Sequence, residues 1–73
     1  MRRYTVLLIP DAEDGGFTAT VPTLPGCVTE GDTLAEALDH ARDAIRLYIE
    51  DLESQGEPVP EETVTLALAT IEA

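Results

Sequence analysis

Apolar and polar positions alternate in a way that divides this chain into four short strands and one long helix. Residues 3–9 carry apolar side chains on both faces of an extended segment, which is typical of an inner strand covered on both sides. Residues 17–21 alternate apolar residues with threonine and predict a half-buried strand. Residues 27–30 predict a short third strand, and residues 63–71 predict the last one.

Turn-forming residues separate these segments. Pro10 ends the first strand, and the acidic segment 11–16 closes with Asp-Gly-Gly, which supplies the positive φ angles of a chain reversal. Pro25 and Gly26 fit the central positions of a type II turn, where proline fixes φ and glycine accepts a positive φ. Gly31 is expected to end the third strand.

A long amphipathic helix follows the third strand. Thr33 lies three residues before Glu36, which is the spacing of a capping box, and Asp32 places negative charge at the positive end of the helix dipole. Gly56 is expected just past the helix end. One apolar stripe recurs at spacings of four and three residues: Leu34, Leu38, Ala41, Ile45, Tyr48 and Leu52.

The element order β-β-β-α-β predicts a single two-layer α+β domain over residues 1–73. The first three strands form an antiparallel meander, and a right-handed crossover through the helix places the last strand parallel to the first. The predicted mixed sheet has the order 3-2-1-4 with the helix on one face, which is similar to the first part of a ribonuclease H fold. Because one helix leaves the other sheet face open in so small a chain, we also expect a homo-oligomer.

The charge of the chain narrows the classes of partner. Fifteen acidic and four basic residues give a formal net charge of -11, which disfavours contact with nucleic acid or an anionic membrane and favours basic partners. The alternative explanation is that the charge only keeps a small protein soluble. The longest apolar run near the start is Val6–Ile9, so neither a signal peptide nor a membrane span is expected, and a cytoplasmic protein is predicted.

Catalytic and metal-binding patterns are missing, so the sequence predicts no enzyme and no cofactor. A ribonuclease H site needs carboxylates on strands that here carry none. Cys27 and His40 are the only conceivable nucleophile and base, but His40 lies about 130° from the centre of the apolar stripe at 100° per residue. A single cysteine and a single histidine cannot form a zinc cluster within one chain, and the segment 11–16 places Gly15 where a calcium loop needs an oxygen ligand.

The stretch from Asp14 to Ile45 resembles the HicB-like antitoxins of toxin–antitoxin pairs. The residues that carry this resemblance are Gly15-Gly16-Phe17-Thr18-Ala19, Pro22-Thr23-Leu24-Pro25-Gly26-Cys27, Gly31-Asp32-Thr33 and Glu36-Ala37. The resemblance implies a partial ribonuclease H fold without catalytic acids, binding to a small basic messenger-RNA-cleaving toxin of the HicA type, and assembly into dimers or tetramers. Many members also carry a DNA-binding segment after the last strand. This sequence ends at Ala73, so a short form without operator binding is expected.

We therefore predict an antitoxin-like binding module that occludes a basic HicA-like toxin. The alternatives are an orphan homo-oligomer that binds a small ligand or has a regulatory role, and a hydrolase acting through Cys27. Leu47 lies off the apolar stripe and is either a lone exposed leucine or a second partner contact. The residues expected to contact the toxin are Asp11, Glu13, Asp14, Leu24, Pro25, Glu30 and Asp32.

Overall fold

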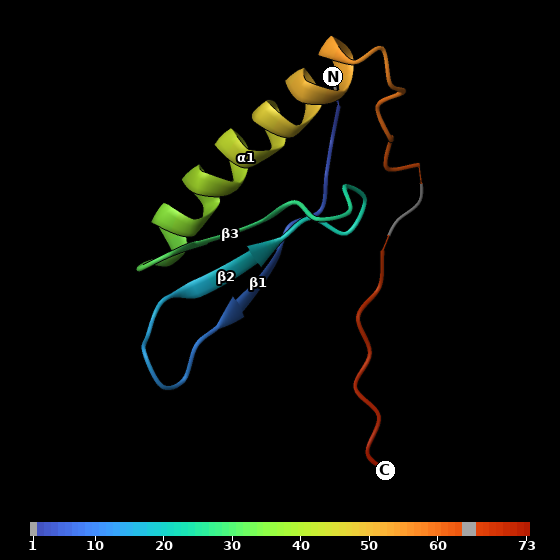
Figure 1. Ribbon diagram of the computed structural model, residues 1–73. Coiled ribbons are helices and arrows are strands. Elements are labelled where there is room, and N and C mark those ends of the chain that lie inside the picture. Colours follow the sequence, from blue (N-terminus) through green and yellow to red (C-terminus); the bar gives the residue numbers. More distant parts are fainter. Residues whose placement is uncertain (1, 64–65) are drawn as a thin grey trace.

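In the part of the chain that the structure describes, three antiparallel strands and one long helix form two layers (Figure 1). The computed structural model describes residues 2–63 and 66–73. The predicted α+β class and the meander of the first three strands are confirmed. The elements are β1 (Leu7–Pro10), β2 (Phe17–Thr20), β3 (Val28–Gly31) and α1 (Leu34–Ser54).

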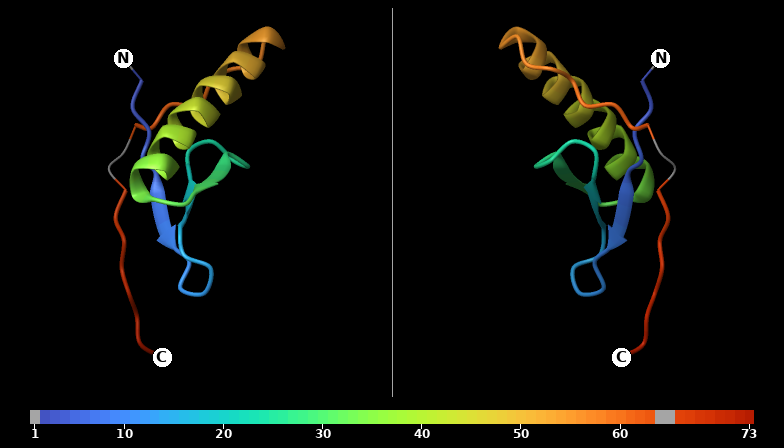
Figure 2. Two further views of the ribbon diagram at one scale, coloured as in Figure 1. Left: turned by 90° about the vertical axis from the view of Figure 1, so that its left-hand side faces the viewer. Right: turned by 90° about the vertical axis from the view of Figure 1, so that its right-hand side faces the viewer.

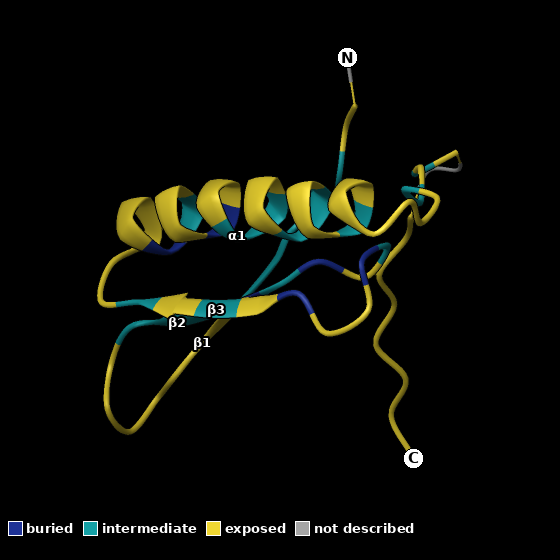
Figure 3. Cartoon of the chain, turned by 45° about the horizontal axis from the view of Figure 1, so that its top comes forward, coloured by how far each residue is buried: buried dark blue, intermediate teal, exposed yellow. Residues whose placement is uncertain are grey.

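The sheet has the order β1-β2-β3, and α1 covers one of its faces (Figure 2). Ala19 lies at the centre of β2, opposite Leu8 of β1 and Thr29 of β3. The helix packs mainly over β3 and β2, so β1 is the least covered strand. Figure 3 shows buried positions on the side of α1 that faces the sheet and in the loop between β2 and β3.

The loop between β2 and β3 supplies the centre of the hydrophobic core. The Cys27 N–H donates to the Leu24 carbonyl at 3.0 Å, and Gly26 has a φ of 82°, as expected for the predicted Pro-Gly turn. Leu24 has an exposed fraction of 0% and clusters with Val21 and Cys27. The partly buried residues packed on this cluster are Tyr4, Val6, Ala44, Ile45 and Tyr48.

Both ends of α1 are capped. The Thr33 hydroxyl accepts from the Glu36 N–H at 3.1 Å, while the Glu36 carboxylate accepts from the Asp32 N–H at 3.2 Å. The second bond therefore falls one residue before the position expected in a capping box. At the other end Gly56 has a φ of 71° and its N–H donates to Glu53, which fits the predicted glycine just past the helix.

The buried side of α1 begins at Ala37, three residues after the position where the sequence pattern places the start of the apolar stripe. Ala37 is fully buried, whereas Leu34 is 47% exposed, so the expectation that Leu34 opens the stripe is wrong. The reason is the close approach of β3: a Cβ on Gly31 would lie 2.8 Å from the Ala37 Cα. Only small residues fit between the helix start and the sheet, and the larger Ile45 and Tyr48 fill the wider end.

The predicted fourth strand is not found in the part of residues 63–71 that the structure describes. Residues 66–73, which we call the C-terminal tail, are extended but have no strand partner, and they run separately from β1 in Figure 1. Residues 64–65, which also belong to the predicted strand, lie outside the described residues. The order 3-2-1-4 and the resemblance to a partial ribonuclease H fold are therefore not confirmed.

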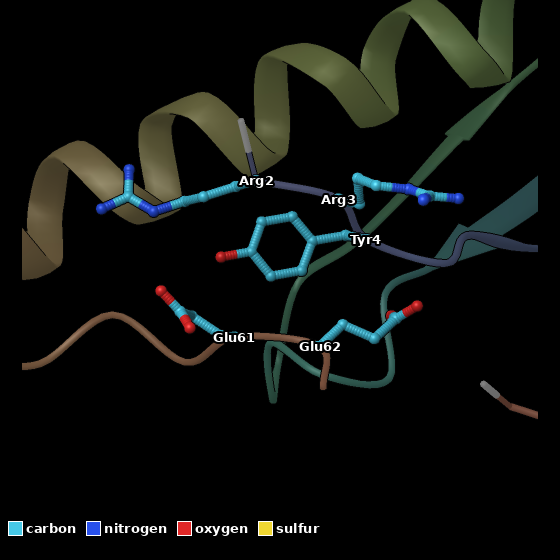
Figure 4. A pocket seen from close by; sticks show the side chains of 5 residues that line it. All are labelled: Arg2, Arg3, Tyr4, Glu61 and Glu62. Atoms are coloured by element: carbon cyan, nitrogen blue, oxygen red, sulfur yellow. The ribbon is translucent and has the colours of Figure 1, made fainter. Parts of the chain in front are cut away.

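A hydrogen-bonded clamp joins the segment after the helix to the start of the chain. The Glu62 carboxylate accepts from the Thr5 N–H at 2.7 Å and from the Thr5 hydroxyl at 2.6 Å, and it also accepts from the Thr23 hydroxyl. The Tyr4 hydroxyl donates to the Pro60 carbonyl at 2.6 Å, and Figure 4 shows the Tyr4 ring between the N-terminal segment and Glu62. β1 begins at Leu7 and not at residue 3, because Leu7 pairs with Thr20, where the partner strand β2 ends.

Candidate partner-binding surface

Acidic side chains from four separate segments surround one hollow of about 330 Å³. The β1–β2 loop, the end of β3, the link to the helix and the first turns of α1 each contribute to it. Phe17 and Thr18 at the start of β2 complete the lining. We call this site the acidic hollow; its charged lining residues are Asp11, Asp14, Glu30, Asp32, Glu36 and His40.

The β1–β2 loop holds its acidic residues in a tight reversal. The Asp11 carboxylate accepts from the N–H groups of Glu13 and Asp14, at 2.9 and 3.1 Å. Gly16 has a φ of 79°, and a Cβ there would lie 2.7 Å from the Gly31 carbonyl oxygen. The loop therefore approaches the end of β3 closely, and this approach brings Asp11 and Asp14 to the same hollow as Glu30.

His40 is the basic member of the acidic hollow. Its Nδ1 lies 2.6 Å from the Glu30 carbonyl oxygen, so the imidazole is held against the end of β3. This hydrogen bond is the largest effect on the pKa of His40 and raises it above its ordinary value of 6.5. Desolvation is the next largest effect and lowers the pKa, while the negative charges of Glu36, Asp43 and Asp39 raise it further. His40 therefore gains its proton at a higher pH than a free histidine and then partly neutralises the hollow.

The structure brings together four of the seven residues that the sequence suggests for partner contact, namely Asp11, Asp14, Glu30 and Asp32. Glu13 is exposed in the same loop but does not line the hollow.

The other two suggested residues lie elsewhere. Leu24 is fully buried in the core, so its side chain offers no surface to a partner in this conformation. Pro25 is exposed at the opposite end of the sheet, where its carbonyl accepts from the Tyr48 hydroxyl at 2.7 Å. The Leu24–Pro25 loop is thus separate from the acidic hollow.

Glu36 and His40 belong to the hollow although the sequence pattern did not place them there. Glu36 was expected only as a capping residue and a part of the family motif, and His40 only as a candidate base. The sequence could have placed them there, because both residues lie one turn apart near the start of the helix, which follows β3 after a short link. Because Glu30 is the residue before the last one of that strand, its carbonyl lies beside the first turns of α1 and contacts His40.

Cys27, the candidate nucleophile, does not line the acidic hollow. Cys27 is 5% exposed in the core, and burial raises the pKa of its thiol, which is opposite to the shift that activates a nucleophile. No group of three or more His, Cys, Asp or Glu side chains in residues 2–63 and 66–73 is placed to hold a metal ion. Within the same residues, no helix combines the length and apolar character that crossing a membrane requires.

Similar proteins share this sequence over most of its length. Residues 4–72 match the family described as the HicB_like antitoxin of bacterial toxin-antitoxin system. A UPF0150 protein of Thermoplasma acidophilum is 48% identical over 58 residues, which cover 80% of this chain and 83% of that protein. A UPF0150 protein of Synechocystis is 49% identical over 59 residues, which cover 81% of this chain and 73% of that protein.

One of the similar proteins carries a functional name. Antitoxin HicB 1 of Photorhabdus laumondii is 42% identical over 62 residues, which cover 80% of this chain but only 39% of that protein. The matched family places the chain in a class of proteins described as antitoxins of bacterial toxin–antitoxin systems. The chain belongs to the HicB-like antitoxin family, as its motifs predict. Membership supports an antitoxin role and implies a toxin partner in general.

Proposed function

We propose that this chain is an antitoxin that binds a basic HicA-type messenger-RNA-cleaving toxin through the acidic hollow. The observation that carries the proposal is the convergence of five carboxylates from four segments on one open hollow, in a chain with a net charge of -11. Family membership indicates that the partner is a toxin, and the negative charge of the chain indicates that this toxin is basic.

The hollow has the chemistry to receive arginine or lysine side chains. Carboxylates accept charge-assisted hydrogen bonds from a guanidinium, and arginine forms two such bonds in a fixed geometry. The carboxylates of Asp14 and Glu30 accept no hydrogen bond from another group within the described part of the chain, so both are open to a partner. Toxin inhibition would follow from covering the basic surface that the toxin uses to bind RNA, without any reaction by this chain.

The acidic hollow also predicts how pH changes toxin binding. Because the pKa of His40 is raised, the imidazole gains a positive charge as the pH falls through that pKa. A positive charge beside Glu36 and Glu30 opposes the approach of a basic partner. Binding to the toxin should therefore weaken toward acid pH, and His40→Gln should remove this part of the dependence.

The proposal is tested by mixing the purified protein with the basic protein encoded beside it and following RNA cleavage and association rate. Asp14→Lys and Glu30→Lys should each slow association and reduce inhibition, most strongly at low salt. Glu57→Lys is the matched control, because it makes the same charge change at the far end of α1. Equal effects of all three variants would show that only net charge matters and would reject the hollow as the contact surface. If no adjacent basic protein binds, the toxin proposal is wrong and the orphan homo-oligomer is the better interpretation.

A further inference from the structure

A second hollow of about 440 Å³ lies between the N-terminal segment and one side of α1. We call it the basic groove, because three of the four arginines in the chain line it: Arg2, Arg42 and Arg46. Its other lining residues are Tyr4, Ile45, Ile49, Glu50 and Glu53. Three positive charges against two negative charges give this lining a net charge of +1, in a chain with a net charge of -11. The basic groove therefore differs in charge from the acidic hollow, and the two share no lining residue.

The basic groove runs along one side of the helix. Arg42, Arg46 and Ile49 follow one another at spacings of four and three residues, so they lie on the same side of α1. This side continues to Glu53, which forms an ion pair with Arg2 of the N-terminal segment at 3.7 Å. From Arg42 to Glu53 the helix rises by about 16 Å. An extended peptide of about five residues has this length.

Apolar side chains lie between the charges of the basic groove. Ile45 and Ile49 on α1 and Tyr4 on the N-terminal segment are each half-buried and line the groove. An occupant that places apolar groups on them removes this surface from water, which favours binding. An occupant that carries only charges would leave the same surface uncovered.

The guanidinium groups of Arg2 and Arg46 have hydrogen-bond donors to offer to an occupant. Arg46 lies 3.5 Å from the Asp43 carboxylate and 3.8 Å from the Glu50 carboxylate, and the ion pair of Arg2 is similarly long. A charge-assisted hydrogen bond measures about 2.7–2.9 Å, so these pairs are loose. A carboxylate from a partner can therefore approach either guanidinium more closely than the chain's own acids do, and form two hydrogen bonds with it.

We propose that the basic groove binds a short segment of a partner protein in which carboxylates alternate with apolar side chains. The carboxylates bond Arg2 and Arg46, and the apolar side chains cover Ile45 and Ile49. The segment carries few carboxylates, because the chain as a whole repels a strongly acidic partner. A nucleic acid fits less well, because it carries a negative charge at every phosphate and has no aliphatic side chain to place on the isoleucines. The proposal is independent of toxin binding at the acidic hollow.

The first test measures peptide binding to the full chain by fluorescence anisotropy. The labelled peptide is Leu-Glu-Leu-Glu-Leu with blocked ends, and its matched control has glutamine in place of glutamate. We expect the glutamate peptide to bind more tightly, and Arg46→Gln to weaken its binding by about two- to fivefold, as for the loss of one exposed ion pair. Equal affinity for the two peptides would overturn the proposal.

Arg3→Gln is the matched control variant for Arg46→Gln. It makes the same change of charge, but Arg3 does not line the basic groove, and Figure 4 shows the Arg2 and Arg3 side chains extending in opposite directions. Arg3 and Arg46 are both exposed, so neither change should unfold the chain. Arg3→Gln should leave the affinity for the glutamate peptide unchanged. Equal losses in the two variants would show an effect of net charge alone and would reject the groove.

The second test locates the occupant and examines the other candidates. In NMR spectra of isotope-labelled isoleucine methyl groups, the glutamate peptide should shift the signals of Ile45 and Ile49 but not that of Ile9, which is exposed on β1. The reverse pattern would place the peptide elsewhere and reject the proposal. A single-stranded RNA of equal charge that shifts the same signals at lower concentration would overturn it in favour of nucleic acid. A lower mass of Arg46→Gln than of the wild type in light scattering would show a second copy in the groove and would overturn it equally.

Discussion

Gly31 shows how one residue without a side chain sets the distance between the layers. It is the last residue of β3, and the sequence pattern had suggested only that it breaks the strand. In the structure it faces Ala37, which is fully buried, so the backbone of the strand approaches the backbone of the helix. This pair of small residues lets the start of α1 lie close against the end of β3.

Replacing Gly31 with alanine should therefore destabilise the fold. The added Cβ would meet the Ala37 Cα at 2.8 Å, and backbone atoms cannot rotate away as a flexible side chain would. We expect a loss of about 1–3 kcal/mol in the free energy of unfolding, as for other overpacked cores. Urea unfolding measures this loss, and Glu30→Ala, an exposed neighbour, should change stability by only about 0.5 kcal/mol. Equal unfolding midpoints for the two variants would contradict the close approach.

At the scale of single residues, the helix caps could be predicted from the sequence, whereas the burial of residues at the helix start could not. The caps at Thr33 and Gly56 follow from local backbone chemistry, and both positions were predicted correctly. The exposure of Leu34 and the burial of Ala37 could not be predicted, because both depend on the distance between helix and sheet. That distance is a tertiary property, and helical periodicity alone does not contain it.

At the scale of elements, the clamp between the two ends of the chain takes the place of a strand pair. The Glu62 carboxylate accepts hydrogen bonds from Thr5, so a side chain holds the segment after α1 against the start of the chain. The sequence pattern identified the apolar alternation of residues 63–71 but not this clamp, because hydrogen bonds between residues 57 positions apart leave no local signal. The predicted strand was therefore placed on an edge that the described residues leave unpaired.

The clamp makes stability depend on pH in a defined direction. Hydrogen bonds from the Thr5 hydroxyl and N–H lower the pKa of Glu62 below its ordinary value of 4.5. A lowered folded pKa gives stability that is present above the unfolded value and is lost as the pH falls through the folded pKa. Glu62→Gln should thus unfold at lower urea than the wild type at pH 7, and the difference should shrink below about pH 4.5. Glu61→Gln is the control, and a difference that stays constant with pH would contradict the assignment.

At the scale of the whole molecule, most arginines form ion pairs with nearby acidic residues, and many acidic residues remain without a basic partner. Three of the four arginines form ion pairs with exposed acidic residues, as in the 2.8 Å pair between Arg42 and Asp39. Such exposed pairs add little stability. The sequence alone predicted an acidic protein, but the grouping of acids from separate segments required the hairpin and the helix start to meet.

Salt should therefore have opposite effects on folding and on partner binding. Screening shortens the Debye length from about 30 Å at 0.01 M to about 10 Å at 0.1 M, which reduces repulsion among the carboxylates. We expect the melting temperature to rise with added sodium chloride, measured by circular dichroism, while association with a basic toxin slows. A variant with Asp14→Asn and Glu13→Gln should show a smaller rise. A melting temperature that falls with salt would mean that attraction outweighs repulsion in the folded chain.

The two connections of the meander have different freedom to change length. The loop between β2 and β3 contains Leu24, the largest fully buried side chain, so an inserted or deleted residue there would move the centre of the core. The loop between β1 and β2 is exposed and bonds mainly to itself. Insertions are tolerated best at exposed loop tips of this kind. The length and the charges of the acidic loop can therefore change during evolution to suit a different partner, while the loop that contains Leu24 keeps one length. Partner recognition can thus change without a change in the hydrophobic core of this small domain.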